Sequence, residues 1–133
     1  MILKTAFLPI PLLGAAAYDP ATTLTEENKM LKHSLFVRLE AKAGKEDEVA
    51  AFLQQGLQLA NQETTTPLWF ALRFGPTTFA IFDAFENEAG RQTHLNGPIA
   101  KALMDNAARL LATPPAIERA DVLGAKLPAE ALR

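Results

Sequence analysis

Hydrophobic and polar residues alternate with the two-residue period of a β-strand in several parts of the chain. In the first of them, residues 33–41, large aliphatic side chains occupy every second position: Leu35, Val37 and Leu39. The positions between them include Phe36 and Arg38, which the alternation places together on the opposite face of the predicted strand. Residues 116–127 are predicted to form the last strand of the domain, with Ile117, Val122 and Leu127 available for burial.

Runs with helical spacing lie between the predicted strands. Residues 43–62 repeat apolar side chains every three to four positions behind an acidic first turn, as an amphipathic helix does. Gly56 interrupts the apolar stripe at a cost of about 1 kcal/mol relative to alanine, which favours a close approach of this helix to the sheet. A short helix is predicted over residues 86–95 and a longer one over 96–112, where Pro98 suits the first turn.

The two middle strands, residues 66–74 and 77–85, flank Gly75–Pro76 and predict a β-hairpin. Both faces of this hairpin are largely apolar, although an antiparallel sheet with helices on one side is expected to be polar on the other. The face turned away from the helices is predicted to carry three aromatic side chains: Phe36, Trp69 and Phe82. Such a face needs a cover, so we expect a homodimer that pairs through the sheet.

The order of these elements is β-α-β-β-α-β, the α+β ferredoxin-like arrangement with an antiparallel sheet. It predicts one domain over residues 31–133, and two such domains pairing as a dimeric α/β barrel. Residues 1–30 are predicted to be an N-terminal arm or linker. We expect a cytoplasmic protein. Residues 1–17 loosely resemble a signal peptide, and the alternative is an exported protein if that segment is one. The apolar stretch is too short to span a bilayer, so no membrane partner is expected.

Composition excludes several kinds of site. Thirteen basic residues against fifteen acidic ones give a net charge of -2 without a basic cluster, which argues against a nucleic-acid partner. The chain has no cysteine, so disulfides, thiol catalysis and cysteine-bound metals are excluded. Its two histidines, His33 and His94, lie far apart in the sequence, and no metal site is predicted.

Two stretches resemble the antibiotic biosynthesis monooxygenase family of dimeric α/β barrels: FVRLEAKAGKEDEVAAFL and WFALRFGPTTFAIFDAFENEAGRQTHLNGPIAKAL. The similar features are the first strand and its turn into a helix, the strand–helix junction FDAFENEA, and the step His-Leu-x-x-Pro that begins at His94. The resemblance covers about residues 33–127. It implies the barrel fold and the oxidation of a small aromatic phenol or quinol by O₂ without a cofactor.

The resemblance also implies a catalytic role for His94, because many members carry a histidine at this step and imidazole is suited to proton transfer. Members that continue to a second histidine have it where this chain has Ile99, so a paired-histidine or haem-binding site is not expected. The alternative for His94 is a structural residue whose ring binds a backbone group or water.

Arg38 is the second candidate catalytic residue, because a guanidinium on the barrel face could meet a substrate oxyanion. Otherwise it needs a carboxylate partner, for which the candidates are Glu40, Asp83 and Glu118. The candidate substrate-binding residues are Trp69, Phe36, Phe82, Arg73 and Asp83. Each also has a structural interpretation: Trp69 as a core aromatic, Arg73 as a solvated residue at the hairpin end, and Asp83 as a partner of Arg38 or His33 or as a helix cap.

A second function fits the same sequence: a non-catalytic dimeric barrel protein that binds a small apolar molecule. An enzyme is expected to bring Arg38, Trp69 and His94 into one pocket. A binding protein is expected to pack Trp69 tightly and to close Arg38 in an ion pair.

Overall fold

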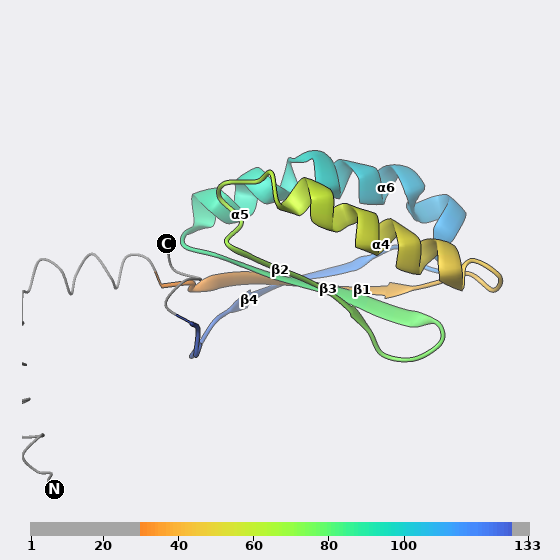
Figure 1. Ribbon diagram of the computed structural model, residues 1–133, viewed down its shortest axis with the longest axis horizontal. Coiled ribbons are helices and arrows are strands. Elements are labelled where there is room, and N and C mark those ends of the chain that lie inside the picture. Colours follow the sequence, from red (N-terminus) through yellow and green to blue (C-terminus); the bar gives the residue numbers. More distant parts are fainter. Residues whose placement is uncertain (1–29, 129–133) are drawn as a thin grey trace, which may run out of the picture. The chain divides into compact units, whose positions relative to one another are not determined.

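The computed structural model describes residues 30–128 of the chain. The predicted N-terminal arm and the signal-peptide-like segment lie outside the described residues, and the domain boundary at residue 31 stays a prediction. Seven elements follow one another: β1 (His33–Glu40), α4 (Glu46–Ala60), β2 (Leu68–Arg73), β3 (Thr78–Phe85), α5 (Glu88–Leu95), α6 (Pro98–Leu110) and β4 (Ala116–Asp121). This order confirms the α+β ferredoxin-like fold (Figure 1).

The four strands form one antiparallel sheet in the order β2-β3-β1-β4. The predicted hairpin is confirmed, and the Phe74 N–H donates to the Thr78 carbonyl across its turn. The last strand ends earlier than predicted, at Asp121. The register explains why β4 ends there. Asp121 lies opposite His33, which is the first residue of β1, so almost no residues of β1 remain for a longer β4 to pair with.

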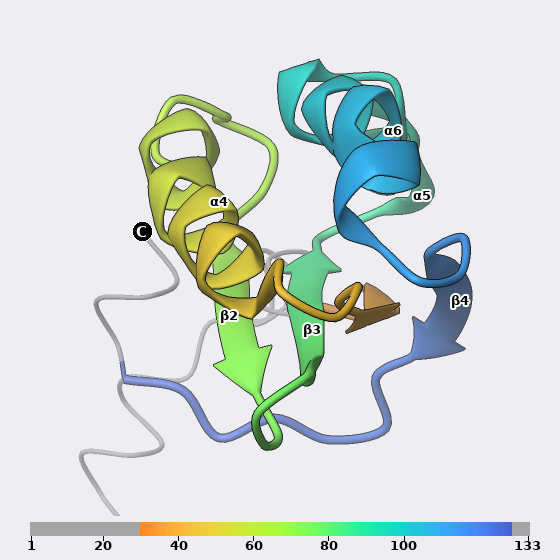
Figure 2. The ribbon, with the colours of Figure 1, turned by 90° about the vertical axis from the view of Figure 1, so that its right-hand side faces the viewer.

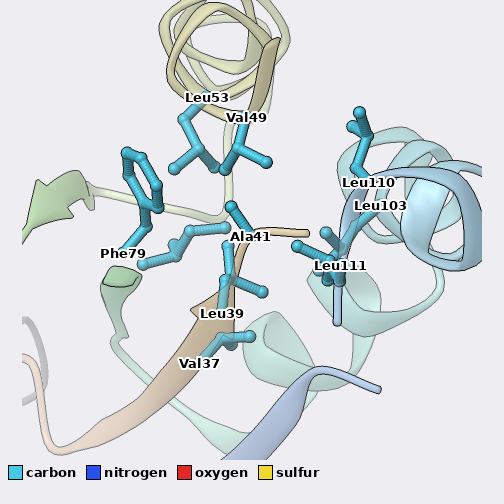
Figure 3. Close-up of a cluster of buried hydrophobic side chains, with 10 residues drawn as sticks. Val37, Leu39, Ala41, Val49, Leu53, Phe79, Leu103, Leu110 and Leu111 are labelled. Atoms are coloured by element: carbon cyan, nitrogen blue, oxygen red, sulfur yellow. The ribbon is translucent and has the colours of Figure 1, made fainter. Parts of the chain in front are cut away.

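The three helices cover one face of the sheet, with α4 on one side and α5 and α6 on the other (Figure 2). The aliphatic face of β1 points toward them, as the alternation predicts. Val49 and Leu53 of α4 point from above onto Val37 and Leu39 of β1 (Figure 3). Phe79 of β3 belongs to the same buried cluster, so the core lies between sheet and helices.

No helix within residues 30–128 lies over the other face of the sheet (Figure 1), and we call it the open face. Phe70 is 49% exposed and Phe74 is 54% exposed. The prediction that Trp69 lies on this face is wrong, because Trp69 pairs with Asp83 and both point toward the helices. Since both faces of β2 are apolar, alternation alone does not distinguish them; the aromatic residue of β2 on the open face is Phe70, stacked on Phe82 with ring centroids 6.4 Å apart.

Local features of the sequence determine where α5 and α6 begin. The Asn87 side chain accepts a hydrogen bond of 2.8 Å from the Gly90 N–H and begins α5. Gly97 is the N-cap of α6, and Pro98 occupies the first helical position, as predicted. The expected close approach at Gly56 is also confirmed, because a Cβ added there would lie 3.4 Å from the ring of Trp69.

Candidate functional site

Three ionisable side chains meet between β3, α5 and the loop after α4. Glu63 Oε1 lies 2.7 Å from His94 Nδ1, and Asp83 Oδ2 lies 3.0 Å from His94 Nε2. Their side chains are 13%, 7% and 1% exposed for Glu63, His94 and Asp83. The Thr66 hydroxyl donates to the same Glu63 oxygen at 2.8 Å. We call Glu63, His94 and Asp83 the buried triad; it engages both ring nitrogens of the histidine.

The local sequence explains why these residues meet. Asp83 lies on the same face of β3 as the apolar residues that point toward the helices, because alternate residues of a strand share a face. Its carboxyl group therefore points into the interior. The Asn87 cap starts α5 just after this strand, and the helix returns over the sheet with His94 near its last turn. The ring of Phe85 lies beside the imidazole, with centroids 5.4 Å apart. Glu63 enters from the turn that ends α4.

Burial and mutual charge set the ionisation of the triad. Burial raises the pKa of Asp83, although the adjacent imidazole of His94 opposes this shift. For His94, burial alone would lower the pKa, but the carboxylates of Asp83 and Glu63 outweigh burial and raise the pKa above 6.5. The histidine is therefore mostly protonated at pH 6.5. Oδ2 of Asp83 is paired with Nε2 of His94, and Oδ1 of Asp83 has no partner among the described residues.

Raising the pH is expected to destabilise the fold. Because the pKa of His94 is higher in the folded protein than in the unfolded chain, the stabilisation is complete below about pH 6.5 and is lost as the pH rises through the raised pKa. Asp83, whose pKa is also raised, acts in the same direction at lower pH. Urea unfolding between pH 6 and pH 9 should show this decline in the wild type and not in His94→Gln. A wild-type stability that rises over this range would contradict the charge assignment.

A cavity of about 170 Å³ lies between the sheet and the helices. Side chains of α4, β2, β3 and α6 form an almost wholly apolar wall, which includes Phe52, Leu59, Trp69, Ile81 and Ile99. A cavity of about 150 Å³ with a similar lining is known to bind benzene, so this cavity has room for one aromatic ring.

The residues of the buried triad do not line this cavity, but Trp69 connects the two. Trp69, which lines the cavity, pairs with Asp83 on the neighbouring strand, and Ile81 precedes Asp83 by two positions on the same face. Within the described residues, the Trp69 indole N–H and Oδ1 of Asp83 are buried without a hydrogen-bond partner. An unsatisfied buried polar atom costs about 1–3 kcal/mol, so a ligand that supplied an acceptor and a donor here would recover this energy.

The structure separates residues that we expected to find in one pocket. Trp69 and His94 lie on the helix side of the sheet, whereas Arg38 lies exposed on the open face. The guanidinium of Arg38 lies 5.6 Å from the ring centre of Phe36 and 5.1 Å from that of Phe74. Arg38 therefore does not share the cavity with the other two residues.

The carboxylates proposed as partners of Arg38 form no ion pair with it in the described part of the chain. Glu40 instead accepts hydrogen bonds from the hydroxyls of Thr77, at 2.6 Å, and Thr78, at 2.7 Å. Asp83 lies on the other side of the sheet, against His94. Its alternatives, a pair with Arg38 or His33 or a helix cap, are therefore wrong.

The remaining candidate binding residues lie away from the cavity. Phe36 and Phe82 are half-buried on the open face. Arg73 donates from Nε to the Gly75 carbonyl and from Nη2 to the Pro76 carbonyl, both at 3.0 Å. It therefore braces the turn of the hairpin.

Glu63 is a site residue that sequence reasoning missed. It lies in a polar stretch after α4, where a solvated carboxylate is the ordinary expectation. Only the packing of this loop against α5 brings it to His94, and no local pattern reports that packing. The neighbouring Thr66, which is 7% exposed, is buried by the same contact.

Two further properties belong to residues 30–128. None of their helices combines the length and the apolar character needed to cross a membrane. No three of their His, Asp or Glu side chains are arranged to hold one metal ion; in the buried triad the two carboxylates contact opposite nitrogens of the imidazole.

The fold is similar to that of solved structures provisionally assigned as antibiotic biosynthesis monooxygenases. A structure provisionally assigned to that family, from Deinococcus radiodurans, is 21% identical, with a TM-score of 0.63 over 72% of this chain and 97% of that one. A second such structure, from Nitrosomonas europaea, is 16% identical, with a TM-score of 0.62 over 69% of this chain and 90% of that one. At these identities the likeness shows the fold alone: it confirms the ferredoxin-like fold of one subunit, and the pairing as a barrel stays a prediction.

A more similar structure is a protein of unknown function from Nitrosomonas europaea. It is 62% identical over 76% of this chain and 98% of that one, with a TM-score of 0.74. The chain therefore belongs to the same family as that protein. No family model and no curated protein matches the chain.

Proposed function

We propose that the protein is a monooxygenase that oxidises a small aromatic phenol or quinol with O₂ and without a cofactor. The observation that carries this proposal is the cavity for one ring, whose wall includes Trp69: its buried N–H has no hydrogen-bond partner among the described residues, and Asp83 pairs with it on the neighbouring strand. The architecture shared with structures provisionally assigned as antibiotic biosynthesis monooxygenases supports it.

The apolar wall of the cavity and the indole N–H of Trp69 have different roles in the proposed binding. The apolar wall takes the ring, and the Trp69 indole donates a hydrogen bond to the substrate oxygen. A volume of about 170 Å³ favours a one-ring substrate over a fused three-ring one. The site thus selects a compact phenol by size and by its oxygen.

Asp83 acts as the proton acceptor in this proposal. Both nitrogens of His94 are engaged, whereas Oδ1 of Asp83 has no partner among the described residues, and the raised pKa of Asp83 makes it a better base than an ordinary aspartate. The imidazolium of His94 offsets the negative charge that the phenolate brings. The phenolate then reduces O₂: one ring C–H becomes C=O, so that phenol and O₂ give a quinone and water.

Oxygen uptake with a panel of one-ring phenols and quinols tests the proposal. Asp83→Asn is expected to lower kcat/KM by about 10²–10⁴-fold, since it removes the general base. Trp69→Phe keeps the aromatic wall and is expected to raise KM more than it lowers kcat. Lys101→Ala, on an exposed helix face, is the control and should match the wild type.

The same panel separates an error in the site from an error in the function. Uptake that is equal in the wild type, Asp83→Asn and Trp69→Phe would mean that the site is misplaced. No enzyme-dependent uptake with any compound would argue against an oxygenase. Loss of activity in Arg38→Ala, with Asp83→Asn fully active, would move the site to the open face.

A non-catalytic binding protein is the second candidate function. It is favoured by the almost wholly apolar wall of the cavity and by the full engagement of His94. Trp69 is the one tryptophan of the chain, so its fluorescence reports on the cavity directly. A change in that fluorescence on adding phenol, without oxygen uptake, would identify this function.

We also propose that two copies pair through their open faces. Each face presents Phe70, Leu72 and Phe74, with exposed fractions of 37–54%. It also carries the Arg38 guanidinium and, beside Phe36, the exposed Glu118 carboxylate, neither with an ion-pair partner among the described residues. Two-fold pairing can join Arg38 of one copy to Glu118 of the other, so the face is complementary to itself in both charge and apolar character.

A further inference from the structure

Gly56 lies in the middle of α4 and lines the cavity. Glycine is less stable than alanine in a helix interior, so its presence there needs a reason. A Cβ at this position would lie 3.4 Å from Cη2 and from Cζ2 of Trp69, which is an ordinary contact distance, and these are the only described atoms within 4 Å outside the neighbouring residues and backbone of α4. Alanine therefore fits, and crowding by the backbone does not explain the glycine.

The contact shows what the missing side chain does for the cavity. The six-membered ring of Trp69 rests against the α4 backbone at Gly56, and both residues line the cavity. A larger side chain would push the indole away from the helix. The indole would then occupy space that a ligand needs, and its N–H would change position relative to the cavity.

We propose that Gly56 determines which ligands the cavity accepts, by setting how closely Trp69 packs onto α4. The ligand class is a one-ring phenol that carries no more than a small substituent. This proposal rests on the ligand site proposed above. Because Gly56 acts through the indole, it is a positioning residue, and direct binding rather than turnover is the measurement that tests it.

The first test compares phenol with 4-methylphenol, which differ by one methyl group. Gly56→Ala adds one methyl group to the cavity wall, so it should reject the larger compound. We expect the affinity ratio of 4-methylphenol to phenol to fall by about 10-fold relative to the wild type, as one carbon atom does in a filled apolar pocket. Binding is measured by Trp69 fluorescence and by calorimetry.

Thermal unfolding supplies a second readout, which separates a loss of ligand binding from a loss of folding. Gly56→Ala is expected to raise the melting temperature by about 4–8 °C, because alanine favours the helix. A gain in stability with a loss of the larger ligand is the expected combination. An unchanged affinity ratio would overturn the proposal, whatever the melting temperature.

Gly56→Val is the stronger variant, since its branched side chain must displace the indole. It should weaken phenol binding by at least 10-fold, whereas Gln58→Val on an exposed position of α4 controls for the β-branched residue and should bind as the wild type does. If Gly56→Val does not fold, Gly56→Ala decides alone.

A wild type that binds neither phenol would overturn the proposed ligand site together with this inference. A wild type that binds while the Gly56 variants bind equally well would overturn the inference alone.

Discussion

Replacing His94 by alanine is expected to destabilise the protein by about 3–5 kcal/mol, because removing one partner of a buried ion pair leaves the other charges uncompensated. Here the effect involves two carboxyl groups, since Glu63 and Asp83 contact opposite nitrogens of the same ring. The free energy of unfolding in urea at pH 7 is the measurement. The cost includes the space that the imidazole leaves beside Phe85.

A second substitution separates the charge from the packing. Asp83→Asn in the His94→Ala background removes one of the two facing charges while it keeps the size of the side chain. The double variant should therefore be more stable than His94→Ala alone, although each substitution by itself is destabilising. A cost of His94→Ala below about 1 kcal/mol, or additive effects in the double variant, would show that the triad is not a coupled charge cluster.

Replacing Phe70 and Phe74 by aspartate is expected to convert a dimer into a monomer. Both side chains are among the exposed apolar residues of the open face, and two-fold symmetry would place four new carboxylates in one apolar interface. Sedimentation equilibrium at micromolar concentration measures the mass. Met104→Asp, at an exposed position of α6 on the other side of the sheet, introduces one aspartate away from the open face and should leave the dimer intact.

This prediction depends on the wild type being a dimer. A stable wild-type monomer at micromolar concentration would refute the pairing of open faces. A dimer that survives both aspartates would place the interface elsewhere. In either case the buried triad and the cavity would be unaffected, because they lie on the helix side of the sheet.

The fold could be predicted because its signals are local. In β1, aliphatic residues alternate cleanly with others, and the structure buries Leu35 and Leu39 to 1% exposure. The Gly75–Pro76 turn and the Pro98 helix start also depend only on neighbouring residues. These signals determined the order of elements, which is enough to define a ferredoxin-like sheet.

The site was less predictable because it depends on which face each strand buries. Trp69 was placed on the wrong face, since the other positions of β2 are equally apolar, and the register with β3 settles the matter. That error also put Arg38 and Trp69 together. Asp83 and His94 were both recognised as candidates. Their contact joins the middle of β3 to the end of α5, eleven residues later, and no periodicity of the sequence predicts such a contact.

The position of the triad links ligand binding to proton binding. A phenolate held by Trp69 would lie near the imidazolium of His94. Binding of the phenolate would therefore favour protonation of His94, and protonation would favour binding by the same free energy. Loading the cavity would then make His94 hold its proton to a higher pH. Conversely, the affinity for the ligand would depend on whether Glu63, at the outer side of the ring, keeps its contact. A loop residue outside the cavity thereby gains influence over what the cavity holds.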